Sequence, residues 1–164
     1  MLRDKSLIPL SHQHQHALAL CVRLDRALQA GEADPIPWQE EIEQHFRQEI
    51  CFHFEAEEKE VFPVAVRFDE LKPLVEELQS EHETLRESFT AAASRSLDAA
   101  GLQRFVASLA MHIRKEERQL FERLQVLLNP VEMSALGIAL ERDLADATQA
   151  CALPDQATRL RPKP

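Results

Sequence analysis

Four segments of the sequence carry apolar residues at spacings of three and four, and each places one histidine on its apolar side. In the segment 102–127, for example, His112 follows Leu109 by three residues and precedes Leu120 by eight. This pattern is typical of amphipathic helices that bury one face. Since an imidazole inside an apolar core needs a partner, the pattern predicts four core-facing helices that meet around a polar site.

The ends of these helices are marked by capping residues, prolines and short polar turns. Ser11 is expected to cap the first helix, and Pro35 and Pro130 suit the first positions of the second and fifth. The helices are expected from Ser11 to about Gly31, from Pro35, from residues 69–73, after the turn at residues 94–98, and from Asn129–Pro130 to about Ala147. Short connections favour antiparallel neighbours. The predicted fold class is therefore all-α: an up-down-up-down antiparallel four-helix bundle with a short additional C-terminal helix.

A chain of 164 residues suits a single domain with a sizeable core. Apolar residues make up 45% of the chain and only 3 residues are glycine, which favours helices over an all-β fold. We predict that residues 1–149 form the bundle, with its core at 10–128 and the extra helix at about 130–147. Residues 150–164 are proline-rich and lack periodicity, so a flexible tail is expected there.

The formal net charge of -9 argues against a nucleic acid or an anionic membrane as a partner. No apolar run approaches the length of a membrane span, and the amino-terminal MLRDKSLIPL lacks the apolar core of a signal peptide, so a cytoplasmic location is expected. Cys21, Cys51 and Cys151 are an odd number of cysteines without a CxxC pair. Neither a disulfide framework nor a thiolate metal site is therefore indicated.

Two glutamates share the buried faces with the histidines, in the motifs HFEAEEKEVFP at residues 53–63 and HIRKEERQLFE at residues 112–122. In each motif a glutamate follows the histidine by four residues, so the two side chains lie one above the other on one helix face. Two ionised carboxylates that face each other in a core are costly unless a cation compensates them. The repeated motif therefore predicts a metal site rather than two exposed helical pairs.

The number of ligands predicts two metal ions. Four histidines and two glutamates are too many for one tetrahedral zinc, whereas two ions could each take two imidazoles and share both carboxylates. A bridging oxide or hydroxide would leave one position on each ion open. These donors suit iron, with manganese or zinc as alternatives, and such a centre should bind or reduce small oxidants. The predicted ligands are His14, His53, Glu57, His82, His112 and Glu116.

Neighbouring side chains offer alternatives to this set. On the first helix His14 is in phase with the apolar face, while His16 is the alternative ligand and His12 is expected in solvent. Glu49 and Arg86 could line the site or its access route.

The other acids of the two motifs are interpreted as surface residues that pair with neighbouring basic side chains: Glu58, Glu60 and Glu117. Three phenylalanines are expected to keep the metal pocket dry: Phe46, Phe89 and Phe105.

At these residues the chain resembles the hemerythrin-like family, also called HHE cation-binding domains. The resemblance extends over Leu10 to Leu128 and rests on LSHQHQHAL, HFEAEEKEVFP, SEHETLR and HIRKEERQLFE, one motif in each predicted long helix. It implies a four-helix bundle around a non-haem di-iron site, with the six predicted residues as ligands and with Glu57 and Glu116 as the bridges.

Two departures make the chain less similar to oxygen-carrying hemerythrins. Those proteins have a second histidine where this chain has Arg86, and an aspartate where it has Glu117. The set of four histidines and two glutamates is more similar to that of bacterial hemerythrin-like proteins linked to nitric oxide, oxygen, redox stress or iron handling. Ferritin-like di-iron proteins are disfavoured, because no glutamate lies three residues before any histidine.

The predicted function is a non-haem di-iron protein that binds or senses small oxidants such as oxygen or nitric oxide. The alternative is a redox enzyme or iron-handling factor that reduces nitric oxide or peroxide or repairs iron-sulfur centres, and it would need a redox partner protein. A third reading, a metal-free structural bundle, leaves two buried acids uncompensated. The sequence assigns no catalytic residue and does not indicate the oligomeric state.

Overall fold

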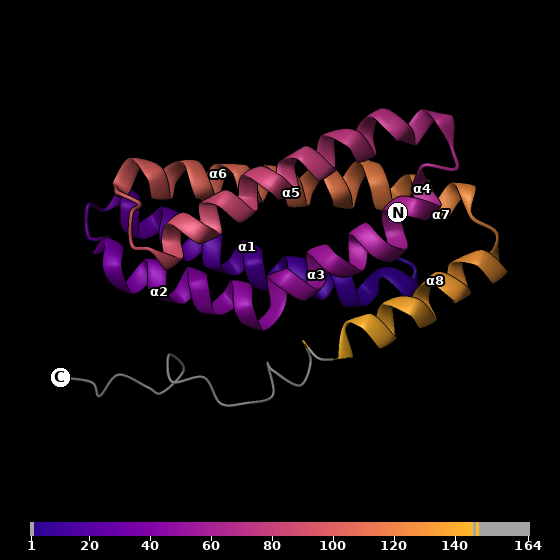
Figure 1. Cartoon of the computed structure of the whole chain (residues 1–164), viewed down its shortest axis with the longest axis horizontal. Coiled ribbons are helices and arrows are strands. Elements are labelled where there is room, and N and C mark those ends of the chain that lie inside the picture. The colour runs from indigo at the N-terminus through magenta and orange to yellow at the C-terminus, as the bar shows by residue number, and fades with distance from the viewer. Residues whose placement is uncertain (1, 146, 148–164) are drawn as a thin grey trace.

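A computed structural model of the protein describes residues 2–145 and 147, and every regular element in this part of the chain is helical. Four long rods run alternately up and down: α1 (Ile8–Gln29), the rod α2–α4 (Pro35–Ala65), α5 (Lys72–Ala93) and the rod α6–α7 (Ala99–Leu127) (Figure 1). The first part of the second rod packs against α5, and α6 packs against both α1 and α5. The predicted all-α antiparallel four-helix bundle is confirmed.

The second and fourth rods contain π-helical turns. They consist of α2 (Pro35–His45), η2 (Phe46–Ile50), α3 (Cys51–Ala56), η3 (Glu57–Val61) and α4 (Phe62–Ala65), and of α6 (Ala99–Lys115), η5 (Glu116–Leu120) and α7 (Phe121–Leu127). The sequence predicted unbroken α-helices here. A π-turn adds only one residue to a turn, so it leaves little trace in the apolar pattern.

The starts of α2 and α6 follow capping residues, whereas α1 and α5 begin without a side-chain cap. Asp34 and Asp98 accept hydrogen bonds from the backbone amides of the first turns of α2 and α6, at 3.1 and 2.7 Å. The expectation that Ser11 caps the first helix is wrong. The helix begins at Ile8, after the short 3-10 helix η1 (Lys5–Leu7) that Asp4 caps. A second 3-10 turn, η4 (Asp69–Leu71), precedes α5.

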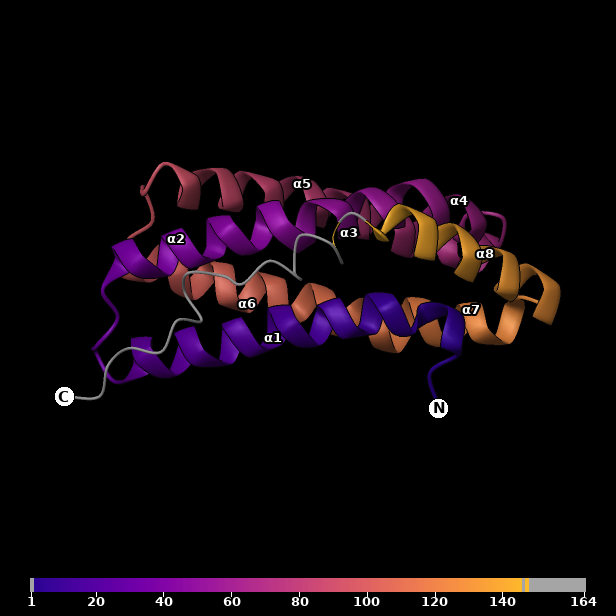
Figure 2. The same cartoon turned by 90° about the horizontal axis from the view of Figure 1, so that it is seen from below.

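The extra helix α8 (Pro130–Asp143) turns back from the end of α7 and packs on one end of the bundle (Figure 2). Asn129 and Glu132 form the capping box that opens it. The helix α8 ends at Asp143, and Ala145 and Ala147 are again helical after the turn at Leu144, while the tail predicted at residues 150–164 lies outside the described residues. Among the described residues, no helix is both long enough and apolar enough to span a membrane.

A polar layer divides the hydrophobic core into two halves. One half lies next to α8 and contains Leu78 and Leu120, while the other contains Leu85 and Leu109. His82 therefore lies on α5 between the two halves, and the buried polar side chains of the other rods occupy the same level. The bundle thus has a polar layer in its middle that the apolar packing on both sides shields from water.

We predict that Gly137→Ala destabilises the protein, because a Cβ on this α8 residue would lie 2.7 Å from Oγ and 2.8 Å from Cβ of Ser6. Overpacking of this kind typically costs about 1–3 kcal/mol, which exceeds the gain of about 1 kcal/mol from better helix propensity. Urea unfolding of Gly137→Ala, Ser6→Gly and the double variant measures the effect. If the contact exists, the double variant should lose less free energy of unfolding than the two single variants lose together. Equal losses would contradict the contact.

Candidate metal centre

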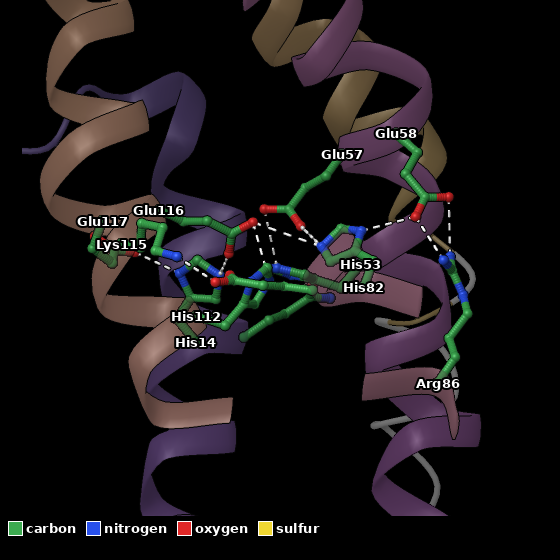
Figure 3. A network of polar contacts seen from close by, with 12 residues as sticks. His14, His53, Glu57, Glu58, His82, Arg86, His112, Lys115, Glu116 and Glu117 are labelled. Atoms are coloured by element: carbon green, nitrogen blue, oxygen red, sulfur yellow. Dashed lines mark hydrogen bonds and ion pairs between the residues drawn. The ribbon is translucent and has the colours of Figure 1, made fainter. Parts of the chain in front are cut away.

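The polar layer brings all six predicted ligands together. His14 from α1, His53 from α3 and His82 from α5 converge with His112 from α6 and with the two glutamates that begin η3 and η5 (Figure 3). Their side chains form two groups whose ligand atoms lie within 4.8 Å of one another: His14, His53, Glu57 and Glu116, and Glu57, His82, His112 and Glu116. The two groups share both glutamates. Each of the six residues is at most 2% exposed.

The converging atoms lie at the spacing of ligands around a common ion. The imidazole Nε2 atoms lie 3.1 to 3.7 Å from the carboxylate oxygens of Glu57 and Glu116. Two donors at 2.0–2.2 Å from one ion and at right angles to each other are separated by about 3 Å. The four Nε2 atoms and the four carboxylate oxygens are buried without a hydrogen-bond partner. Since buried polar atoms normally have partners, these eight atoms fit a pair of metal ions.

The other ring nitrogen of each histidine has a partner that orients the ring. The Nδ1 of His14 donates to Glu117 at 2.7 Å, that of His82 donates to Glu58 at 2.8 Å, and that of His112 donates to Glu81 at 2.8 Å. His53 instead donates to the amide oxygen of Gln13 at 2.8 Å. Because Nδ1 carries the proton in all four bonds, Nε2 is left as the atom that can bind metal.

Basic side chains compensate the charges of the three outer carboxylates, which are those of Glu58, Glu81 and Glu117. Arg86 donates to both oxygens of Glu58 at 2.7 and 3.0 Å (Figure 3). Arg3 donates to Glu117 at 2.6 Å, and Lys115 donates to Glu81. His82 and Arg86 together lower the pKa of Glu58 to about 2. Each of these carboxylates is therefore held as an anion between a ring Nδ1 and a cation.

The two sequence motifs build equivalent halves of this network. Glu57 and Glu116, four residues after their histidines, enter the centre. Glu58 and Glu117, five residues after, support the predicted ligand of a rod that contributes no central glutamate, His82 or His14. The phenylalanine nine residues after each motif histidine, Phe62 or Phe121, packs on that same ligand, with ring centroids 5.3 and 5.6 Å apart.

The π-turns hold this arrangement at the backbone. The amide of Phe62 donates to the carbonyl of Glu57, and the amide of Phe121 donates to the carbonyl of Glu116. Each bond joins residues five apart in the sequence instead of the four of an α-helix. The π-turn therefore lies between the glutamate that enters the centre and the phenylalanine that covers it. Single π-turns of this kind are common at functional sites.

Protons on the histidines can balance the charges of Glu57 and Glu116. Burial lowers the pKa of His14, His82 and His112, but the nearby carboxylates outweigh it and raise these values to about 9, 11 and 9. Burial acts to raise the pKa of Glu57 and of Glu116, and the charge of Glu116 acts to raise that of Glu57 as well, but the surrounding histidines hold the pKa of both below the ordinary value. Imidazolium protons thus supply positive charge that metal ions would otherwise provide.

Two of the alternatives lie outside the centre. On α1 the alternative ligand His16 is exposed, and its Nδ1 lies 3.0 Å from Oε2 of Glu49 instead of joining either group. Arg86 does not point into the centre either, because it pairs with Glu58 and lies over the ring of Phe54 at 5.4 Å. His12 is exposed, as expected.

The outer acids Glu58 and Glu117 do pair with basic side chains, Arg86 and Arg3, but both are half-buried and also support histidines, a contact that was not predicted. Glu60 does lie near the surface, beside Lys59 and Arg142. The phenylalanines in ring contact with the histidines are Phe54, Phe62 and Phe121. Of the three expected to keep the pocket dry, Phe89 and Phe105 are buried in the adjacent half of the core and Phe46 packs against it.

Gln13 and Glu81 were missed by the sequence reasoning. The available signal was position, because each directly precedes a predicted ligand, His14 or His82. Adjacent residues on a helix point in different directions, so a side chain next to a ligand reaches the histidine of another rod.

Comparison with known proteins agrees with this arrangement. The family model of the hemerythrin HHE cation binding domain matches residues 9–124, a range that includes all six central residues. No match was found to a curated protein or to a solved structure.

We predict that metal binding releases protons and strengthens as the pH rises from 7 to 9. The raised pKa values mean that His14, His82 and His112 carry protons at pH 7, which metal must displace from Nε2. Loading at pH 7 should release about two to three protons per chain, and fewer at pH 10. Calorimetry in buffers of different ionisation enthalpy counts them. No release at pH 7 would contradict the charge balance described above.

Proposed function

The chain belongs to the hemerythrin HHE cation-binding family, and on this premise we propose that it holds two iron ions and binds or senses small oxidants such as oxygen or nitric oxide. The observation that carries the proposal is the set of eight buried, converging donor atoms without hydrogen-bond partners. In this proposal His14 and His53 would hold one ion, His82 and His112 would hold the other, and both ions would share Glu57 and Glu116. Imidazole and carboxylate donors suit iron, although manganese or zinc would accept the same set.

The enclosure of the centre supports a small ligand. Phe54 stacks on His82 with ring centroids 3.9 Å apart, and Phe62 and Phe121 cover the centre from the side of α8. These rings and the burial of all six central residues shield the donor atoms from water. A bound pair of iron ions would supply the binding or reduction of small oxidants. The protein's own part is to orient the imidazoles and to keep the site dry.

Binding or sensing is favoured over a redox enzyme by the composition around the centre. The chain contains no tyrosine, and the aromatic side chains in contact with the histidines are phenylalanines, which do not relay electrons through a phenolic radical. Reduction of nitric oxide or peroxide, or iron donation, would need a redox partner protein. Such a partner and a cytoplasmic location both stay predictions.

The first test is the metal content of protein purified without oxygen, followed by absorption spectra on addition of oxygen or nitric oxide. We expect about two irons per chain and a reversible spectral change, since the donor set offers two four-ligand groups. Continuous consumption of the oxidant with an electron donor would support the redox alternative. Absence of metal after reconstitution with iron would refute the proposal.

A second test removes one bridge at a time. We predict that Glu57→Gln and Glu116→Gln each abolish binding of the metal pair, because a neutral amide compensates less charge and bridges poorly. The matched control is Glu55→Gln, since Glu55 is exposed on α3 two residues before Glu57. Metal content by mass spectrometry should fall to about one ion or less in both bridge variants and stay unchanged in the control. Two ions per chain in both bridge variants would rule out the bridging roles.

A further inference from the structure

We propose that the two metal positions are inequivalent, with the position formed by His14 and His53 binding its ion more weakly than the position formed by His82 and His112. This inference rests on the proposed metal centre and deepens it. It comes from one difference between the two otherwise equivalent halves of the network: Gln13 supports His53, whereas Glu81 supports His112.

The equivalence of the two halves makes this difference informative. Glu58 and Glu117 occupy the same place in the two motifs and both bind a ring Nδ1. Gln13 and Glu81 also occupy the same place, directly before the predicted ligand of a rod that contributes no central glutamate, and both bind the Nδ1 of the ligand histidine in the next rod. Three of the four supporting residues are therefore carboxylates, and Gln13 is the neutral exception.

The charge of the supporting group affects the donor strength of the histidine. A carboxylate that accepts the Nδ1 proton pulls it from the ring and makes Nε2 a better donor to a cation. An amide oxygen accepts the same hydrogen bond but carries no net charge, so this effect is weaker. The pair His82 and His112 has two carboxylate supports, from Glu58 and Glu81. The pair His14 and His53 has one, from Glu117.

The surface next to Gln13 favours exchange at the same position. Gln13 lines a surface pocket together with His16, Glu49 and residues of α1 and the C-terminal region. The amide side chain thus lies between solvent and His53, and offers no charge to hold an ion there. We therefore expect the position of His14 and His53 to be loaded last and to be emptied first by a chelator.

The test uses Co²⁺ as the probe on the full chain, with stepwise affinities from competition with a chelator. Hyperfine-shifted Nδ1–H signals in proton NMR identify the position, with assignments from His53→Ala and His82→Ala. In the unmodified protein the signals of His82 and His112 should appear first, and the two affinities should differ about 10-fold or more, the usual range for loss of a supporting partner.

The decisive variant is the exchange Gln13→Glu with Glu81→Gln, which keeps the net charge and should reverse the order of loading. Gln13→Glu alone, a nearly isosteric change, should raise the weaker affinity about 10-fold and leave the stronger one within a few-fold. Circular dichroism verifies folding, and the single variant tests the inference if the exchange variant does not fold. Parallel appearance of all four signals, or an unchanged order in the exchange variant, would overturn the inference while leaving the two-metal centre intact. Failure to bind Co²⁺ at all would instead count against the proposed function.

Discussion

The structure depends on two carboxylates, Glu57 and Glu116, that face the same four imidazoles in the middle of an apolar bundle. Both are fully buried, and their oxygens have no hydrogen-bond partners. Buried carboxylates are tolerated only when positive charge lies beside them. The protein can supply that charge in two ways, as protons on the histidines or as metal ions. The rods, the π-turns and the outer acids hold all four Nε2 atoms around the two carboxylates, where metal ions can bind them.

Support for this layer is built from the outside inwards. A basic side chain at the surface compensates an acid, the acid accepts the Nδ1 proton of a histidine, and the histidine directs Nε2 to the centre. Arg86, Glu58 and His82 form one such chain. The outer side chains of this series, Arg86 and Glu58, are half-buried, so solvent and salt reach them more easily than the centre. Where the supporting residue is an amide, as at His53, the chain stops at a neutral group, which is the basis of the proposed inequivalence.

Much of this architecture could be predicted from the sequence, and the failures share a physical cause. The four rods and the six central residues follow from the apolar period of each helix, because that period determines which side chains face inwards. The start of the first helix at Ile8, the π-turns, and the histidine contacts of Glu58 and Glu117 did not follow. These features depend on contacts between rods, which periodicity within one rod does not specify. Glu117, for instance, looked like a surface acid because the histidine that it supports, His14, belongs to another rod.

The sequence by itself therefore determined which residues are buried and which chemistry they can support. Helix geometry places His53 above Glu57 and His112 above Glu116, and the cost of burying such pairs points to a cation. Only the tertiary structure decided which histidines share an ion and which residues support them. The physical reason is that pairing between rods depends on their rotation and height relative to one another. The bonds from His53 to Gln13 and from His112 to Glu81 join rods, and they exist only once the bundle has packed.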